Sequence, residues 1–168
     1  MPRTQEEFEE FAVARTPQLY RAAWLLCGDA HRAEDLVQEA LAKVYVRWHR
    51  RLGGPVEHPV AYAHTTLTRT YLSAQRRRSN HEKPIEQLPE RPEPGGDADT
   101  SLALQAALAQ LVPLDRAVLV LRYLEDVSVA DTASVLGVSQ GAVRTRTMRA
   151  LDRLRAVLGP SLRDLLEI

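Results

Sequence analysis

The stretch from Asp126 to Leu158 constrains the fold of this 168-residue chain more than any other. Its apolar residues recur at helical spacing on both sides of Gly137, and glycine suits a sharp turn because it adopts a positive φ at low cost. Ser128 and Ser139 stand where the two helices would begin, and a serine hydroxyl there accepts a hydrogen bond from a free backbone N–H. The stretch therefore predicts two helices joined by a short turn.

The second of these helices has an apolar face and an arginine-rich face. Its apolar residues include Val143, Ala150 and Leu154. A helix pair with such a turn and a basic outer face is typical of a helix-turn-helix, whose second helix enters the major groove of DNA. An ordinary αα-hairpin with a solvated basic face is the alternative. The spacing of Ala133, Gly137 and Val143 favours DNA reading.

The predicted DNA contacts lie at the start of this helix and on its basic face. An arginine can form two hydrogen bonds with the edge of a guanine, and free backbone N–H groups at a helix start favour phosphate. The expected contacts are Ser139 and Gln140 at the helix start, followed by Arg144, Thr145, Met148 and Arg149 for base edges.

The composition predicts an all-α fold, because alanine, leucine, arginine and glutamate dominate. Helices are expected at about 4–27, 31–50, 59–78, 101–112 and 113–124, and Pro17 could kink or divide the first of them. No apolar run approaches the roughly 18 residues needed to span a bilayer. A single cysteine excludes a disulfide framework, and the acidic start is no signal peptide, so a cytoplasmic protein is expected.

The segment 81–100 interrupts the helical pattern and divides the chain. It holds four prolines, two glycines and six acidic against two basic residues, so we expect a flexible acidic linker. Residues 1–80 hold 12 basic and 9 acidic residues, and residues 101–168 hold 8 and 7. The sequence thus predicts two small helical domains, 1–80 and 101–168, joined by the linker 81–100.

Two marks in these domains, taken in order, resemble a known family. The front half contains the run Ala-Glu-Asp-Leu-Val-Gln-Glu-Ala at 33–40, and the back half contains Arg116 to Leu154 with the helix-turn-helix. Together, on either side of an acidic linker, they resemble the extracytoplasmic-function class of bacterial RNA polymerase sigma factors, in particular the actinobacterial branch. The resemblance implies a region 2 domain and a region 4 domain that direct promoter-specific transcription initiation.

The resemblance also implies roles for residues. Asp35, Gln38 and Glu39 would dock on the clamp coiled coil of core RNA polymerase, and the apolar shoulder from Val118 to Leu124 would contact its flap. The helix-turn-helix would read the −35 element of promoter DNA. Capture of the unpaired −10 strand would fall to a basic track with stacking groups: Arg50, Arg51, Tyr62, Arg69, Arg76, Arg77 and Arg78. Family members often carry asparagine where this chain has Arg69.

Other function classes fit less well. A stand-alone helix-turn-helix regulator usually dimerises, and no dimerisation helix or effector pocket is evident. A protein-binding adaptor is a further alternative. An enzyme is the weakest hypothesis, because the five histidines are scattered and the cysteine has apolar neighbours. We expect no cofactor and no metal site, and the sequence leaves open whether an anti-sigma factor binds.

Overall fold

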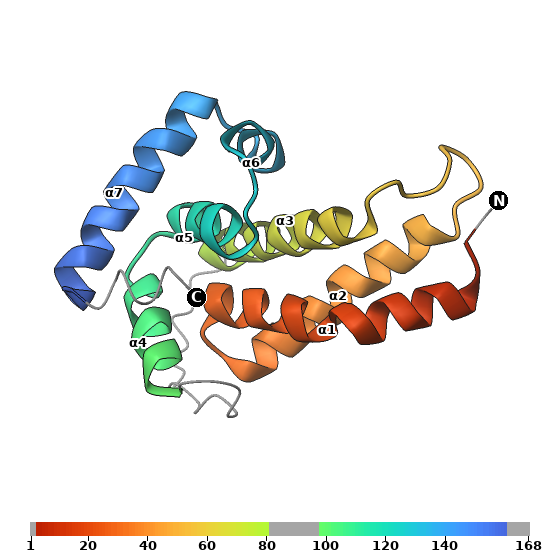
Figure 1. Ribbon diagram of the computed structural model, residues 1–168, viewed down its shortest axis with the longest axis horizontal. Coiled ribbons are helices and arrows are strands. Elements are labelled where there is room, and N and C mark those ends of the chain that lie inside the picture. The colour runs from red at the N-terminus through yellow and green to blue at the C-terminus, as the bar shows by residue number, and fades with distance from the viewer. Residues whose placement is uncertain (1–2, 81–97, 161–168) are drawn as a thin grey trace.

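A computed structural model describes residues 3–80 and 98–160, and every regular element within these ranges is helical, which confirms the predicted all-α fold (Figure 1). The front half contains α1 (Gln5–Cys27), α2 (Ala30–Trp48) and α3 (Pro59–Asn80). The back half contains α4 (Ala98–Leu108), α5 (Pro113–Leu119), the π-helical segment η1 (Val120–Leu124), α6 (Val129–Leu136) and α7 (Gln140–Leu158). Helix α4 begins three residues before the expected position. The expected linker flexibility concerns mainly 81–97, which lies outside the described residues.

Helix α1 begins and ends with the local signals that the sequence contains. Thr4 and Glu7 form a capping box, with Glu7 N–H donating to Thr4 Oγ1 at 3.2 Å and Thr4 N–H donating to Glu7 Oε2 at 2.6 Å. Gly28 ends the helix with a φ of 70°. Pro17 does not divide the helix, since α1 continues through it. Packing against α2 on both sides of Pro17 offsets the loss of one backbone hydrogen bond.

Aromatic residues fix the far end of the front half. Trp48, at the end of α2, is buried, lies 5.6 Å from the Phe8 ring and 5.3 Å from the Phe11 ring, and donates through Nε1 to Thr4 O at 3.2 Å. The guanidinium of Arg3 lies over its ring at 4.7 Å. The start of α1 is therefore held against the end of α2, which leaves the opposite face of α2 exposed.

The back half differs from the expected single helix over 113–124. Helix α5 ends at Leu119, and the backbone then widens into the π-turns of η1, where Glu125 N–H donates to Val120 O at 3.1 Å. Val127 N–H donates to Leu121 O at 2.9 Å, so the segment that leads to α6 folds back against η1. A run of apolar residues at helical spacing fits α-helical and π-helical turns alike, so the sequence could not indicate this widening.

The helix-turn-helix forms as predicted. Ser128 caps α6 by accepting from Asp131 N–H at 3.0 Å, and Ser139 caps α7 by accepting from Ala142 N–H at 3.0 Å. Gly137, between the two helices, has a φ of 66°. The local sequence signals are therefore sufficient to place both helix starts and the turn.

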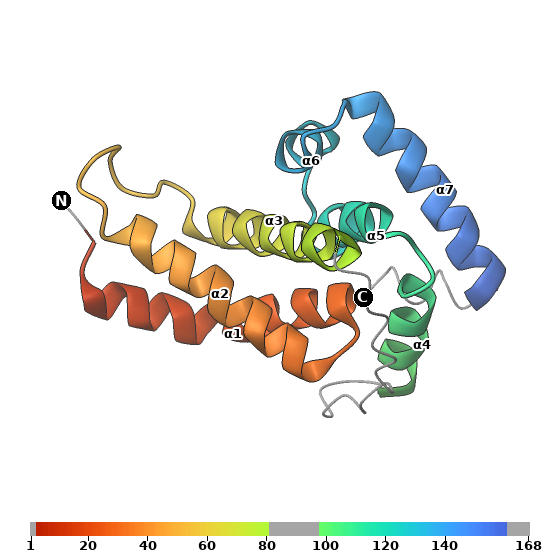
Figure 2. The same ribbon diagram turned by 180° about the vertical axis from the view of Figure 1, so that it is seen from behind.

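The two halves pack on each other, and both Figure 1 and Figure 2 show the back half against the α3 side and the end of α1. Helix α1 contacts α4, α5 and η1, while α3 contacts α5 and α6. Buried apolar residues of both halves form one continuous core. Helix α7 lies at the outer edge, supported by α4, α5 and α6. Across the described parts of the chain, none of the helices combines the length and apolarity that a membrane crossing requires.

Candidate nucleic-acid interface and polymerase surface

Helix α7 presents its predicted DNA contacts on one exposed side. Ser139, Gln140, Arg144, Thr145, Met148 and Arg149 are all exposed, and Met148 retains 68% of its accessible surface. Met148 places an apolar side chain among these polar and basic groups, where it could contact a thymine methyl group. The structure brings all six predicted residues together over the first three turns of the helix.

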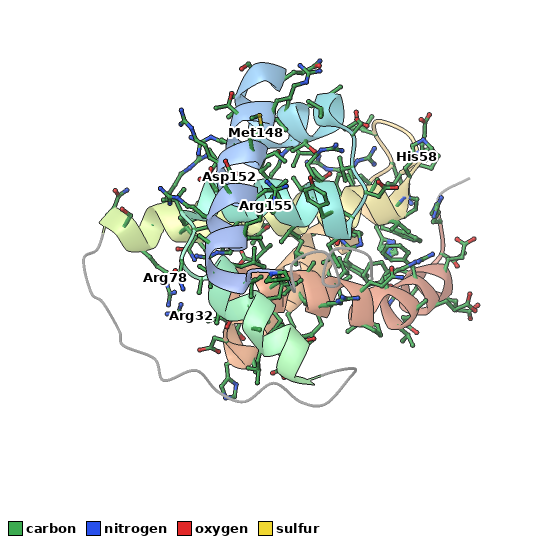
Figure 3. The ribbon with its side chains drawn as sticks, turned by 60° about the vertical axis from the view of Figure 1, so that its left-hand side comes forward. Arg32, His58, Arg78, Met148, Asp152 and Arg155 are labelled. Carbon is green, nitrogen blue, oxygen red and sulfur yellow. The ribbon has the colours of Figure 1, made fainter. Side chains whose placement is uncertain are left out.

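An ion pair marks where this basic side ends. Asp152 and Arg155 lie on the same side of α7 as Met148, as Figure 3 shows, and Arg155 Nη1 lies 3.2 Å from Asp152 Oδ1. A carboxylate repels phosphate, so the surface suited to DNA stops about one turn after Met148. Recognition helices typically read bases with their N-terminal residues, which matches this limit.

The opposite side of α7 is anchored in the back half. Val143, Ala150 and Leu154 are fully or almost fully buried. Arg146, which lies beside the exposed face, forms an ion pair with Asp115 of α5 at 2.6 Å. Arg153 lines a separate small groove with Ala107, Leu111 and Val157, together with Gln110 and Ala156. These two arginines are therefore placed away from the predicted DNA contacts.

The seven residues expected at the −10 strand are spread along the front half. Arg50 and Arg51 are exposed in the loop after α2, whereas Arg76, Arg77 and Arg78 are exposed at the end of α3. Tyr62 is partly buried against the core, and Arg69 contacts the back half. From Pro59 to Arg76 the helix rises roughly 26 Å at 1.5 Å per residue, so the structure makes two basic clusters and not one.

Arg32, which the sequence analysis did not select, belongs to the second of these clusters. It lies at the start of α2 near Arg78 at the end of α3 (Figure 3). Burial and, secondly, repulsion from Arg78 lower the pKa of Arg32 from its usual value. The antiparallel course of α2 and α3 brings these two guanidinium groups together. The sequence could have indicated this only if the start of α2 had been placed beside the end of α3.

The predicted polymerase contacts on α2 lie on its exposed face. Asp35, Gln38 and Glu39 are exposed, while Leu36, Val37 and Ala40 on the other side are buried, as the helical period requires. Glu39 pairs with Lys43 at 3.3 Å, and both side chains are about half exposed. The acidic and amide groups are therefore accessible to a partner protein.

The apolar shoulder from Val118 to Leu124 is largely covered. Val118, Leu119, Val120 and Leu121 are buried in the core, and only Tyr123 is substantially exposed, at 43%.

Among the described residues, no group of three histidine, cysteine, aspartate or glutamate side chains is placed to hold a metal ion.

Comparison with known proteins identifies the family to which this chain belongs. Residues 12–81 match the model of Sigma-70 region 2, and residues 101–154 match Sigma-70, region 4. The RNA polymerase sigma-E factor of Streptomyces coelicolor is 40% identical over 159 residues, which cover 90% of this chain and 86% of that protein. The chain therefore belongs to the extracytoplasmic-function sigma factors, a non-enzymatic class that directs promoter recognition by RNA polymerase.

Further relatives agree with this family. The ECF RNA polymerase sigma factor SigM of Mycobacterium tuberculosis is 31% identical over 146 residues, covering 84% of this chain and 72% of that protein. The solved SigJ of the same organism is similar with a TM-score of 0.62 and 27% identity, over 91% of this chain and 53% of that chain. The sigma factor RpoE of Bartonella quintana shares the fold, with a TM-score of 0.67 and 23% identity, over 92% and 98% of the two chains.

Proposed function

We propose that the exposed face of α7 reads the −35 element, with Arg144 and Arg149 bonding guanine edges and Thr145 and Met148 contacting neighbouring bases. The observation that carries this proposal is the single exposed surface that joins these four residues to the capped helix start at Ser139 and Gln140. Its apolar reverse side is buried, so the helix can enter a groove without uncovering the core.

In the front half, we propose two separate contacts with the opened −10 region. The loop cluster of Arg50 and Arg51 precedes α3 in the chain, and the half-buried ring of Tyr62 in the first turn of α3 would provide the stacking surface. The cluster at the end of α3, Arg76 to Arg78 with Arg32, provides phosphate contacts about 21 Å further along the helix than Tyr62. This division follows from the length of α3.

The polymerase contacts are proposed on both halves. Asp35, Gln38 and Glu39 would bind the clamp coiled coil, because they form an exposed acidic and amide surface backed by a rigid helix. Tyr123 is the accessible part of the proposed flap contact, and the rest of that shoulder would need to be uncovered. Since RNA polymerase is the partner, we place the protein in the cytoplasm, with region 2 at 1–80, the linker at 81–100 and region 4 at 101–168.

An anti-sigma factor is a further proposed partner. The solved Bartonella quintana relative, RpoE, forms a complex with the anti-sigma factor NepR. A chain with the same fold offers a comparable template, and the exposed acidic surface of α2 is the region we expect such a partner to occupy. Competition between polymerase and that partner would then concern Asp35, Gln38 and Glu39.

Reconstituted transcription tests the proposed function. Purified chain added to core RNA polymerase should give promoter-dependent transcripts, and Asp35→Lys should greatly reduce them, whereas Glu10→Lys, an exposed acidic change on α1, should not. A stand-alone regulator would instead protect duplex DNA from cleavage without polymerase and would give no transcripts. That second pattern would reject the proposal.

A further inference from the structure

Met148 of α7 is an apolar side chain that lies in water. It retains 68% of its accessible surface and does not pack against the apolar core. The helix is held in this orientation by Val143 and Leu154, which are buried on its other side. The thioether sulfur is therefore fixed at the surface, and Figure 3 shows Met148 on the same side of α7 as Asp152 and Arg155.

The other sulfur-containing side chains differ in their surroundings. The chain has two methionines and one cysteine, and Met1 lies outside the described residues. Cys27 packs against the apolar core at the end of α1, and burial raises the pKa of its thiol to about 11. Such a thiol is almost entirely protonated at neutral pH, whereas the thiolate is the reactive form. Within residues 3–80 and 98–160, Met148 is therefore the sulfur that a dissolved oxidant can attack.

Polar and basic groups surround Met148 on the exposed face. Arg144 and Thr145 precede it by four and three residues, which places them beside it on the helix, and Arg149 follows it directly. All three are exposed. In the part of the chain that the structure describes, neither arginine forms an ion pair. Their guanidinium groups are therefore available to any acceptor that comes close to the sulfur.

We propose that Met148 is a site of reversible oxidation, at which a peroxide converts the thioether to a sulfoxide and thereby weakens reading of the −35 element. The reactant is a small, water-soluble peroxide, and hydrogen peroxide is the probe. The consequence for promoter reading rests on the proposed function, whereas the reactivity of the sulfur stands on its exposure alone.

The chemical step transfers one oxygen atom. A lone pair of the sulfur attacks one oxygen of hydrogen peroxide, and the S–O bond forms as the O–O bond breaks. The proton of the transferred hydroxyl passes to the departing hydroxide, which leaves as water. The sulfur is oxidised by two electrons and the peroxide is reduced by two. Methionine sulfoxide reductases, which use electrons from a thiol, reverse the step.

The sulfoxide changes the exposed face of α7 in two ways. It replaces an apolar group that suits the methyl group of thymine with a polar group that accepts hydrogen bonds. Arg144, one helical turn away, can donate to the new oxygen, and a guanidinium engaged there is not available to a guanine edge. Oxidation therefore affects the apolar contact and the guanine contact together.

The effect of oxidation should stay local. Met148 contributes nothing to the apolar core, so the sulfoxide leaves the packing of α7 intact, unlike oxidation of a buried methionine. The proposed polymerase contacts Asp35, Gln38 and Glu39 lie on α2. Oxidation should therefore change promoter reading while polymerase binding and helical content stay the same.

Peptide mass measurement after peroxide treatment tests the reactivity of the sulfur. The peptide that contains Met148 should gain one oxygen at a rate within roughly threefold of that of free methionine, because most of its surface is accessible. Promoter DNA bound together with polymerase should slow this gain roughly fivefold or more, since a DNA contact covers the sulfur. A Met148 that stays unmodified while free methionine is oxidised overturns the site, and oxidation without protection in the promoter complex overturns its place at DNA.

Reconstituted transcription tests the consequence. Catalase removes the peroxide before untreated core polymerase is added, and rates are compared on promoters substituted at each −35 position. Oxidation should lower the rate on the preferred promoter roughly tenfold, the loss expected for a base contact. Treatment of the oxidised chain with a methionine sulfoxide reductase should restore the rate.

Two variants are the matched controls, and each is judged by the ratio of its treated to its untreated rate. Met148→Leu removes the sulfur and keeps Met1 and Cys27, so its ratio should be close to one. The double variant Met148→Leu, Val157→Met moves the sulfur to the groove beside Arg153, at a position that is 47% exposed. Its new methionine should be oxidised without lowering the rate.

The outcomes distinguish this inference from the proposed function. An untreated chain that gives no promoter-dependent transcripts rejects the proposed function and the effect on promoter reading with it, while the mass gain still decides the reactivity. Normal transcripts before treatment and an equal rate after full oxidation of Met148 overturn the inference alone. An equal loss in Met148→Leu or in the double variant, or a loss of helical content by circular dichroism, also overturns it.

Discussion

Arg146 of α7 and Asp115 of α5 form a 2.6 Å ion pair that connects the DNA-facing helix to the helix beneath it. The Asp115 carboxylate is 12% exposed, while the Arg146 side chain retains 36% of its surface. The pair is therefore asymmetric, because the Arg146 guanidinium can be solvated if the pair breaks, whereas the Asp115 carboxylate is nearly buried and cannot. The pair adds a polar contact to the buried apolar side of α7, which together set the direction in which Arg144 and Met148 point.

This asymmetry predicts unequal losses of stability. Arg146→Met leaves a nearly buried carboxylate unpaired and should lower the free energy of unfolding by about 1–3 kcal/mol. Asp115→Asn should cost less, because Arg146 can be solvated. The exposed Asp152–Arg155 pair provides the control, and Arg155→Met should change stability very little. Urea denaturation measures all three, and equal losses at the two pairs would contradict this account.

The base preference at the −35 element should depend on Arg144. Arg144→Ala should relax the preference at one base pair and weaken promoter binding by the polymerase complex by about 1–3 kcal/mol. Arg153→Ala is the control, because Arg153 lines the groove beside α4 and not the exposed face. The measurement is the set of transcription rates on promoters substituted at each −35 position. An unchanged preference in Arg144→Ala would remove this residue from base reading.

Gly137→Ala should test how much the turn depends on backbone conformation alone. Gly137 has a φ of 66°, and no atom lies within 4 Å of the position that a Cβ would occupy. The expected loss of stability is therefore the intrinsic cost of a left-handed alanine, about 1–2 kcal/mol, without a steric contribution. Gly137→Asn should cost less, because asparagine tolerates this conformation. Thermal unfolding followed by circular dichroism distinguishes the two, and an equal loss would point to a contact of the side chain.

Alkaline pH should destabilise the protein through two buried acids. Burial raises the pKa of the Cys27 thiol from 9.0 to about 11 and the pKa of the Tyr71 hydroxyl from 10.0 to about 12. Above about pH 9 the unfolded chain releases protons that the folded chain retains, so the free energy of unfolding falls as pH rises. The limit is about 2.7 kcal/mol for each group, and each group reaches it once pH exceeds its own folded pKa.

The double variant Cys27→Ala, Tyr71→Phe should have a flatter dependence between about pH 8 and pH 11 in urea denaturation. Tyr71→Phe also removes an acceptor for Arg116, so the variants are compared by slope and not by absolute stability. A slope identical to that of the unaltered chain would mean that other groups cause the alkaline loss.

Local features of this fold could be predicted from the sequence, and long-range features could not. Thr4, Ser128, Ser139 and Gly137 act on backbone groups within a few positions, so their roles follow from their neighbours in the chain. The exposed face of α7 follows from the helical period. The contact from Arg116 to Leu26 spans 90 residues, and its partner is a carbonyl that every residue possesses. No pattern of side-chain types can indicate such a pairing.

The same distinction explains the outcome for the front-half arginines. The resemblance implied a basic track, but only the packed helices reveal that Arg32 and Arg78 share one end of the bundle. Arg69 was expected at DNA, and its guanidinium donates to two carbonyls of α6. The widened turn of η1 was also not predictable, because the apolar run from Val118 to Leu121 fits an ordinary buried helix equally well.

The two halves that Arg69 and Arg116 join are parts of one polypeptide, and this affects how the chain responds to its surroundings. Docking within one molecule has an effective concentration that is typically in the millimolar range, so contacts too weak to hold separate proteins together suffice here. Dilution in a growing cell leaves that concentration unchanged. The fraction of chains in which the two halves are docked is therefore independent of the abundance of the protein.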